Sequence, residues 1–163
     1  MLDLCRNALQ AFESLDCRID EATPDFPAKD IWHTSLTWRW WVNLGLHAFY
    51  ADPATRERLK PEALWEIEQG EKLSALDVSR AVTVRDLYHR SVLRLFDTYD
   101  YVLAPAAQVF PFDKSVHWPS AVAGRTMDTY HHWMETVVPW SLSGLPVAAV
   151  SAGFGQQGLA TGL

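Results

Sequence analysis

The sequence is poor in cysteine and in long apolar runs. Its 163 residues include two cysteines, Cys5 and Cys17. Two isolated thiols form neither a disulfide framework nor a zinc cluster, which favours reduced cysteines in a cytoplasmic protein. No apolar run approaches the roughly 20 residues that span a bilayer, and residues 1–6 lack the basic and apolar regions of a signal peptide. We therefore expect no membrane partner.

Basic residues are also scarce. Lys and Arg total 14 against 20 Asp and Glu, which gives a net charge of −6. A surface of this sign repels phosphate backbones, so nucleic acid is not an expected partner. The length suffices for one sizeable core, and we expect a single domain over residues 1–163.

Tryptophan, by contrast, is abundant. The chain has eight, and five of them are Trp32, Trp38, Trp40, Trp41 and Trp65. Such large rings usually lie in cores or interfaces. A chain of this size has difficulty burying all of them, which predicts self-association, most simply as a homo-oligomer.

The periodicity of the apolar residues and the positions of proline, glycine and capping residues predict an α/β protein with helices packed on a small mixed sheet. Gly70 is expected to cap one helix, Ser74 and Asp77 form a capping box for the next, and Pro139 ends the last. The expected helices cover residues 3–15, 31–50, 61–70, 75–99 and 126–138. The expected strands cover residues 17–21, 101–103 and 147–150, with an ordered loop at 105–125. So few strands indicate an incomplete sheet.

Residues 153–158, GFGQQG, match the G-x-G-x-x-G pattern of dinucleotide-binding turns. Such a site needs a following helix and an acidic residue about 20 positions later. Only five residues follow Gly158, and Gly162 is among them. We therefore interpret the pattern as a turn whose glycines allow positive φ, and expect no cofactor.

Other candidate chemistry is also incomplete. His131 and Glu135 would share a helix face, but a zinc site needs a third ligand, so an i,i+4 polar pair is the simpler interpretation. Ser141 and Ser143 lie outside any G-x-S-x-G elbow, and Ser143-Gly144 is typical of a turn. The lysines have polar residues or prolines as neighbours, so none is expected to be buried as a general base would be. The residues of the chain therefore predict no metal site and no catalytic residue.

Three stretches in order resemble the C-terminal half of the amidase signature family of serine amidohydrolases. They are ALQAFESLDCRIDEATPDFP at 8–27, KLSALDVSRAVTVRDLYHRSVLRLFDTYDYVLAPAA at 72–107 and WSLSGLPVAAVSAGFGQQGLATGL at 140–163. Ser151 and Ala160-Thr161 depart from the family pattern in the last stretch. The resemblance implies a partial domain of the amidase signature fold and hydrolysis of small carboxamides by the intact enzyme.

The resemblance also implies a catalytic Ser-Ser-Lys set, and no stretch of this sequence matches it. The positions that correspond to the family's substrate-pocket wall are Met134, Val137, Trp140, Ser143, Gly144 and Leu145. For Trp140, packing as an ordinary aromatic side chain is the somewhat simpler interpretation. The leading hypothesis is a piece of an amidase that supplies scaffold and pocket wall and is inactive alone. The alternative is a non-catalytic, self-associating interaction module derived from such a hydrolase.

Overall fold

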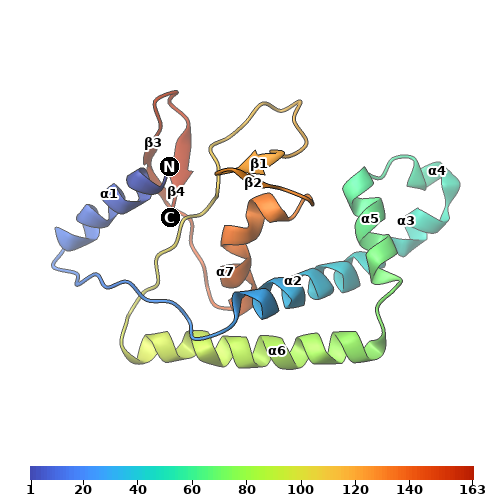
Figure 1. The fold of residues 1–163 in the computed structure, drawn as a ribbon, viewed down its shortest axis with the longest axis horizontal. Helices are drawn as coiled ribbons and strands as arrows, with labels where there is room; N and C mark the ends of the chain where they lie inside the picture. Colours follow the sequence, from blue (N-terminus) through green and yellow to red (C-terminus); the bar gives the residue numbers. More distant parts are fainter. The chain divides into compact units, whose positions relative to one another are not determined.

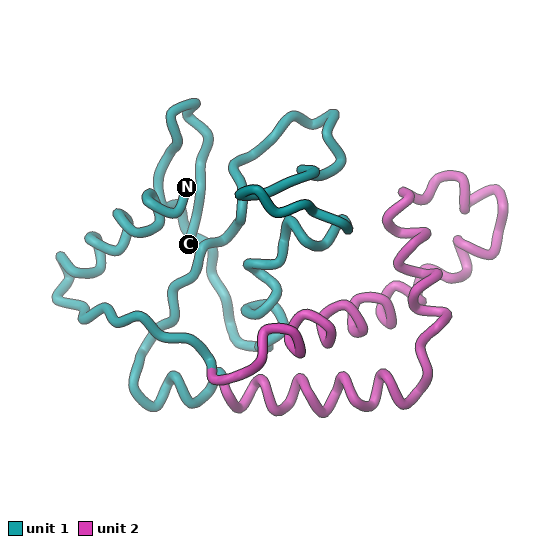
Figure 2. Tube along the Cα trace, in the orientation of Figure 1, with its two compact units in different colours: residues 1–24, 92–163 teal, residues 25–91 magenta.

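The computed structural model describes residues 1–163 and consists of helices with two small antiparallel sheets (Figure 1). The chain divides into two compact units (Figure 2), of which unit 1 comprises residues 1–24 and 92–163 and unit 2 comprises residues 25–91. The α-helices are α1 (Leu2–Glu13), α2 (Ala28–Asn43), α3 (His47–Ala51), α4 (Pro53–Arg56), α5 (Pro61–Gly70), α6 (Ala75–Leu93) and α7 (Val138–Ser143). The 3-10 helices are η1 (Leu44–Leu46), η2 (Arg94–Asp97) and η3 (His132–Val137), and the strands are β1 (Ala121–Val122), β2 (Arg125–Thr126), β3 (Ser151–Phe154) and β4 (Ala160–Gly162).

Unit 2 is built around the contact between α2 and α5. The Trp40 and Trp65 rings meet edge to face, with centroids 5.8 Å apart. Beside them the buried carboxylate of Glu66 accepts hydrogen bonds from Nε of Arg39 and Nδ2 of Asn43. Because an unpaired buried charge is costly, these donors are what allow a glutamate in this interface.

Gly70 has a different role from the one predicted. It is the last residue of α5, and the cap residue after it, Glu71, has a right-handed φ of −60°. A Cβ on Gly70 would lie 2.6 Å from the carbonyl oxygen of Trp40 and 2.9 Å from Cγ of Leu44. Glycine is therefore required by the close approach of α5 to α2 and not by a left-handed cap.

The capping box of α6 is confirmed. The backbone N–H of Ser74 donates to Oδ2 of Asp77 at 2.9 Å, and the N–H of Asp77 donates to Oγ of Ser74 at 3.2 Å. Hydrogen bonds from the Ser74 side chain and backbone lower the pKa of Asp77. The helix continues as η2, so the predicted span of 75–99 is nearly correct.

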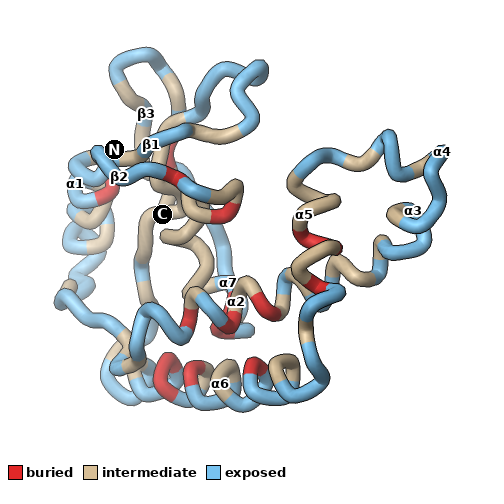
Figure 3. Tube along the Cα trace, turned by 45° about the vertical axis from the view of Figure 1, so that its right-hand side comes forward, coloured by how far each residue is buried: buried red, intermediate tan, exposed pale blue.

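Tyr88 is the largest fully buried side chain (Figure 3 shows the buried positions along α6), and its ring packs edge to face on Phe26. Its hydroxyl has no hydrogen-bond partner. Burial raises the pKa of Tyr88 to about 12, because the charged phenolate is disfavoured away from water.

In unit 1, α1 packs on the β3–β4 hairpin. The buried thiol of Cys5 lies 3.8 Å from the carbonyl oxygen of Gly162, and both cysteines are free. The hairpin accounts for residues 153–158: Gly153, with φ of 130°, lies at an irregularity of β3, and Gly158, with φ of 72°, lies in the turn between the two strands. The interpretation as a turn is confirmed.

The expected strands at 17–21, 101–103 and 147–150 are wrong. All three segments are irregular, although Val150 exchanges two backbone hydrogen bonds with Leu163 beside the hairpin. Tyr101 is 84% exposed and Val147 68%. Segments of this kind form strands only when a neighbouring strand pairs with them, and in this chain the first two have no such neighbour.

The predicted helix at 126–138 is also wrong in its bounds. β2 occupies its start, η3 its end, and α7 begins where Pro139 was expected to stop it. Proline suits the first turn of a helix because its missing N–H has no intrahelical partner there. The β1–β2 hairpin was not predicted, and its turn places Ala123 and Gly124 at φ of 50° and 81°, as a type I′ turn requires.

Candidate functional site

The residues predicted to form a pocket wall lie on one continuous stretch of unit 1. Met134 and Val137 belong to η3, and Trp140 and Ser143 belong to α7. The chain leaves α7 at Gly144, which has a left-handed φ of 74°. Leu145 follows it and is half-buried.

Ser143 holds this turn together. Its hydroxyl donates to the carbonyl oxygen of Trp140 at 2.6 Å and accepts from the N–H of Leu145 at 3.3 Å. The side chain is 1% exposed. A buried hydroxyl with these two hydrogen bonds stabilises the turn, which is the role that the Ser143-Gly144 pair predicted.

A pocket of about 330 Å³ lies elsewhere in unit 1, and it was missed from the sequence. Residues 107 and 109–112 of the loop, Trp133 of η3, and residues 160–162 of β4 line it. None of the predicted wall residues is among them. Of its lining, the sequence marked Ala160 and Thr161 as departures from the family pattern. No local pattern could have joined three segments this far apart in the chain.

Hydrogen bonds from the backbone and from one side chain hold the walls of this pocket in place. The N–H of Ala106 donates to the carbonyl oxygen of Gly162 at 2.9 Å, which joins the loop to β4. Gln108 joins the loop to η3: its side-chain amide nitrogen Nε2 donates to the His132 carbonyl at 3.3 Å, and its Oε1 accepts from the Thr136 N–H at 2.7 Å. The pocket is thus formed by hydrogen-bonded segments.

The histidine-rich segment is occupied by polar pairs. Nδ1 of His132 is paired with the carboxylate of Asp128, and Oε2 of Glu135 lies 2.7 Å from Nη1 of Arg125. His131 is buried. No group of three or more His, Cys, Asp or Glu side chains is arranged to hold a metal ion.

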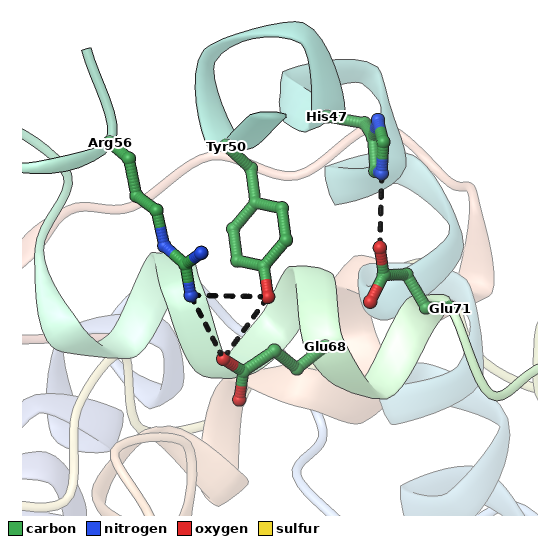
Figure 4. A network of polar contacts seen from close by, with 5 residues as sticks. All are labelled: His47, Tyr50, Arg56, Glu68 and Glu71. Atoms are coloured by element: carbon green, nitrogen blue, oxygen red, sulfur yellow. Dashed lines mark hydrogen bonds and ion pairs between the residues drawn. The ribbon is translucent and has the colours of Figure 1, made fainter. Parts of the chain in front are cut away.

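A second polar cluster lies in unit 2, where α3, α4 and α5 meet (Figure 4). The guanidinium of Arg56 lies 4.2 Å from the centre of the Tyr50 ring and 3.9 Å from Oε1 of Glu68. The Tyr50 hydroxyl lies 3.4 Å from the same oxygen, and Nε2 of His47 lies 3.0 Å from Oε1 of Glu71. These side chains are about half exposed, and they fasten the short helices to α5.

Comparison with known proteins identifies relatives. A model of the amidase family matches residues 42–163. An acylamidase of Rhodococcus erythropolis is 27% identical over 167 residues, which cover 100% of this chain and 34% of that protein. No helix of the chain has both the length and the apolar character needed to cross a membrane.

Two solved structures share the fold. A bacterial aryl acylamidase of the amidase signature enzymes superposes with a TM-score of 0.79 at 20% identity, over 98% of this chain and 35% of that one. A 6-aminohexanoate cyclic dimer hydrolase superposes with a TM-score of 0.68 at 15% identity, over 98% and 36%. The expected fold class is confirmed, and the chain spans about a third of the length of these relatives.

Proposed function

The chain belongs to the amidase family, and from this premise we propose that it supplies scaffold and one substrate-pocket wall to a hydrolase of small carboxamides. The observation that carries the proposal is the match of the family over residues 42–163, which includes α6, η3, α7 and the β3–β4 hairpin. The wall itself is assigned by motif position to Met134, Val137, Trp140, Ser143, Gly144 and Leu145.

The local structure supports a wall of fixed shape. The Ser143 hydroxyl closes the end of α7, and Gln108 ties the N–H of Thr136 in η3 to the preceding loop. Side chains on such a braced segment lose little further freedom when a substrate binds. Trp140 offers the largest apolar surface among them and is half-buried.

We expect the 163-residue chain to be inactive alone. A serine hydroxyl is a weak nucleophile without an adjacent base, and Ser143 is fully buried and used by its own turn. The test measures amine and ammonia release by the purified chain from acylated aromatic amines and simple carboxamides. Rates equal to buffer are expected, and turnover that is lost in a Ser141→Ala or Ser143→Ala variant would contradict the proposal.

The wall is tested by photoaffinity labelling. A carboxamide that carries a diazirine on its acyl group is crosslinked to the chain, and the labelled peptides are sequenced. Labels concentrated in residues 134–145, and competed by the unlabelled amide, are expected. Labels distributed evenly over the exposed surface would show that these residues form no wall.

The second candidate is a self-associating interaction module without catalysis. The observation in its favour is apolar exposure: Leu15, Tyr101, Val147 and Phe154 are 73%, 84%, 68% and 65% exposed. Both candidates predict association of the chain with itself, most simply as a homo-oligomer. A reading frame upstream of Met1 that encodes a glycine- and serine-rich loop and a lysine favours the amidase piece, and its absence favours the module.

A cytoplasmic location is part of the proposal. Two free thiols, one of them exposed at Cys17, suit a reducing compartment. Fractionation of the source cells, with detection of the chain by antibody, tests this location.

A further inference from the structure

We propose that a row of aromatic side chains in unit 1 takes up a one-electron oxidising equivalent at Trp133 and holds it as a radical on Tyr130. The oxidant is a small neutral radical, such as nitrogen dioxide. The reaction involves no amide and no hydrolysis, so it goes beyond the proposed function. All of the residues of the row belong to unit 1.

The rings of this row contact one another in sequence. Trp133 and Tyr130 meet edge to face with centroids 6.3 Å apart, and Tyr130 and Trp118 with centroids 5.9 Å apart. Phe112 extends the row beyond Trp133, at 5.5 Å, and His117 extends it beyond Trp118, at 6.3 Å. Separations of roughly 4.5–7 Å are those of aromatic rings in direct contact. An electron therefore passes between neighbouring rings without an intervening group.

Three rings of the row are oxidisable, and one of them is accessible from the pocket. Tryptophan and tyrosine lose an electron far more readily than phenylalanine does, so Trp133, Tyr130 and Trp118 are the redox-active members. Trp133 lines the pocket of about 330 Å³, whose lining contains no charged side chain. A neutral radical enters such surroundings more readily than a charged one, because it leaves little hydration behind.

The surroundings of the two rings set the direction of transfer. Nε1 of Trp133 is shielded from solvent and has no hydrogen-bond partner, so an oxidised indole there has no acceptor for its proton and stays a radical cation. A charge without water or a partner is unfavourable. Tyr130 is half-buried, and its phenol becomes a neutral radical once its proton passes to water. The oxidising equivalent therefore moves from Trp133 to Tyr130, and Trp118 on the other side shares it.

The electrons and protons balance as follows. Nitrogen dioxide takes one electron from Trp133 and becomes nitrite. Trp133 regains an electron from Tyr130, whose phenolic proton is released to water. A thiol in solution then reduces the tyrosyl radical by supplying one electron and one proton, and the resulting thiyl radicals combine in pairs to a disulfide. The aromatic row is restored, so it acts as a sink that removes oxidising radicals at the expense of thiol.

The test generates the oxidant beside Trp133 in the full chain. A ruthenium polypyridyl photo-oxidant is attached to a Phe112→Cys, Cys17→Ser variant. Phe112 is 38% exposed and contacts Trp133, whereas Cys5 is buried and does not react with the label. After a laser flash with hexaammineruthenium(III) as quencher, transient absorption and electron paramagnetic resonance identify the radical. We expect a tryptophan radical that converts to a tyrosyl radical at a rate independent of protein concentration. Absence of the tyrosyl radical would overturn the proposal.

Matched variants of the labelled chain locate the path. Tyr130→Phe is expected to lose the tyrosyl radical, whereas Tyr101→Phe, at an 84% exposed position of the same unit, retains it. Trp133→Phe is expected to lower its yield, and Trp41→Phe, in α2, to leave the yield unchanged. Equal effects within either pair would contradict the assignment. Circular dichroism of each variant shows whether it is folded.

A second measurement needs no substitution within the redox-active part of the row. A nitroso spin trap is present during the flash, and the trapped residues of the labelled chain are identified by peptide mass spectrometry. Adducts concentrated on Tyr130 and Trp118 are expected. Adducts concentrated instead on Tyr99 or Tyr101 would show that the oxidising equivalent does not follow the row.

Discussion

At the scale of single residues, buried polar groups are the informative positions. Tyr88 and Glu66 are both buried in unit 2, and they differ in their partners. Glu66 receives hydrogen bonds from two side chains, whereas the Tyr88 hydroxyl receives none. Their substitutions are therefore expected to change the free energy of unfolding by different amounts.

Tyr88→Phe is expected to change the free energy of unfolding by less than about 1 kcal/mol at pH 7, because no hydrogen bond is lost. It also removes an alkaline sensitivity. The pKa of Tyr88 is raised from 10.0 to about 12, so between these values the unfolded chain releases a proton that the folded chain retains. Stability of the parent thus falls as pH rises through this window.

Urea unfolding from pH 8 to 12 measures this effect. The variant is expected to lose less stability than the parent above pH 10, and Tyr101→Phe, at an 84% exposed position, to behave as the parent does. Parallel curves for Tyr88→Phe and the parent would show that the phenol is not the titrating group.

Glu66→Gln is expected to destabilise the chain by about 1–3 kcal/mol, because a charged acceptor between Arg39 and Asn43 is replaced by a neutral amide that has only one accepting oxygen. The matched control is Glu68→Gln on the same helix, whose side chain is 43% exposed and whose loss costs less than about 1 kcal/mol. Urea midpoints compare the two. A larger loss for Glu68→Gln would contradict the role assigned to burial.

At the scale of elements, the close approach of α5 to α2 determines how Gly70→Ala changes the stability of the chain. Helix propensity alone would predict the wrong sign for this change. Gly70→Ala improves helix propensity, yet its Cβ would lie 2.6 Å from the Trp40 carbonyl, which belongs to the backbone of α2. We expect a loss of about 1–3 kcal/mol from overpacking. Thermal unfolding measures it.

Gly45→Ala is the control for this prediction. No atom lies within 4 Å of a Cβ at Gly45, and the residue is in η1 with no positive φ. There alanine is expected to be neutral or to stabilise by about 0.4–1 kcal/mol through the unfolded state. Two variants of similar stability would show that α2 and α5 can separate at no cost.

At the scale of the whole molecule, the exposed apolar side chains of unit 1 predict association. Val147→Lys and Phe154→Lys place a charge on such positions, which are 68% and 65% exposed. Each is expected to shift the proposed oligomer toward the 18.5 kDa monomer, because a charge in an apolar contact is desolvated without a partner. Sedimentation velocity measures the shift.

Gln157→Lys adds the same charge at an exposed turn of the same hairpin, where it replaces a polar side chain and removes no apolar one. It is expected to leave the oligomer intact. If this variant dissociates the oligomer as strongly as Phe154→Lys does, net charge and not apolar contact governs association.

The sequence by itself determined the elements whose causes are local. Pro61 starts α5, the Ser74–Asp77 box starts α6, and Gly158 allows the positive φ of the hairpin turn, because first-turn prolines, caps and positive φ depend on neighbours in the chain. The ordered motifs also identified the family, which residues 42–163 confirm.

Only the tertiary structure decided what depends on distant partners. The segments at 17–21 and 101–103 are irregular because strands need pairing that a local pattern does not contain. Pro139 lies in the first turn of α7 instead of ending a helix, because a residue without an N–H is compatible with the first turn of a helix as well as with the residues after its end. The pocket arises because backbone and side-chain hydrogen bonds bring residues 107–112 beside η3 and β4, a proximity that depends on long-range folding of the chain.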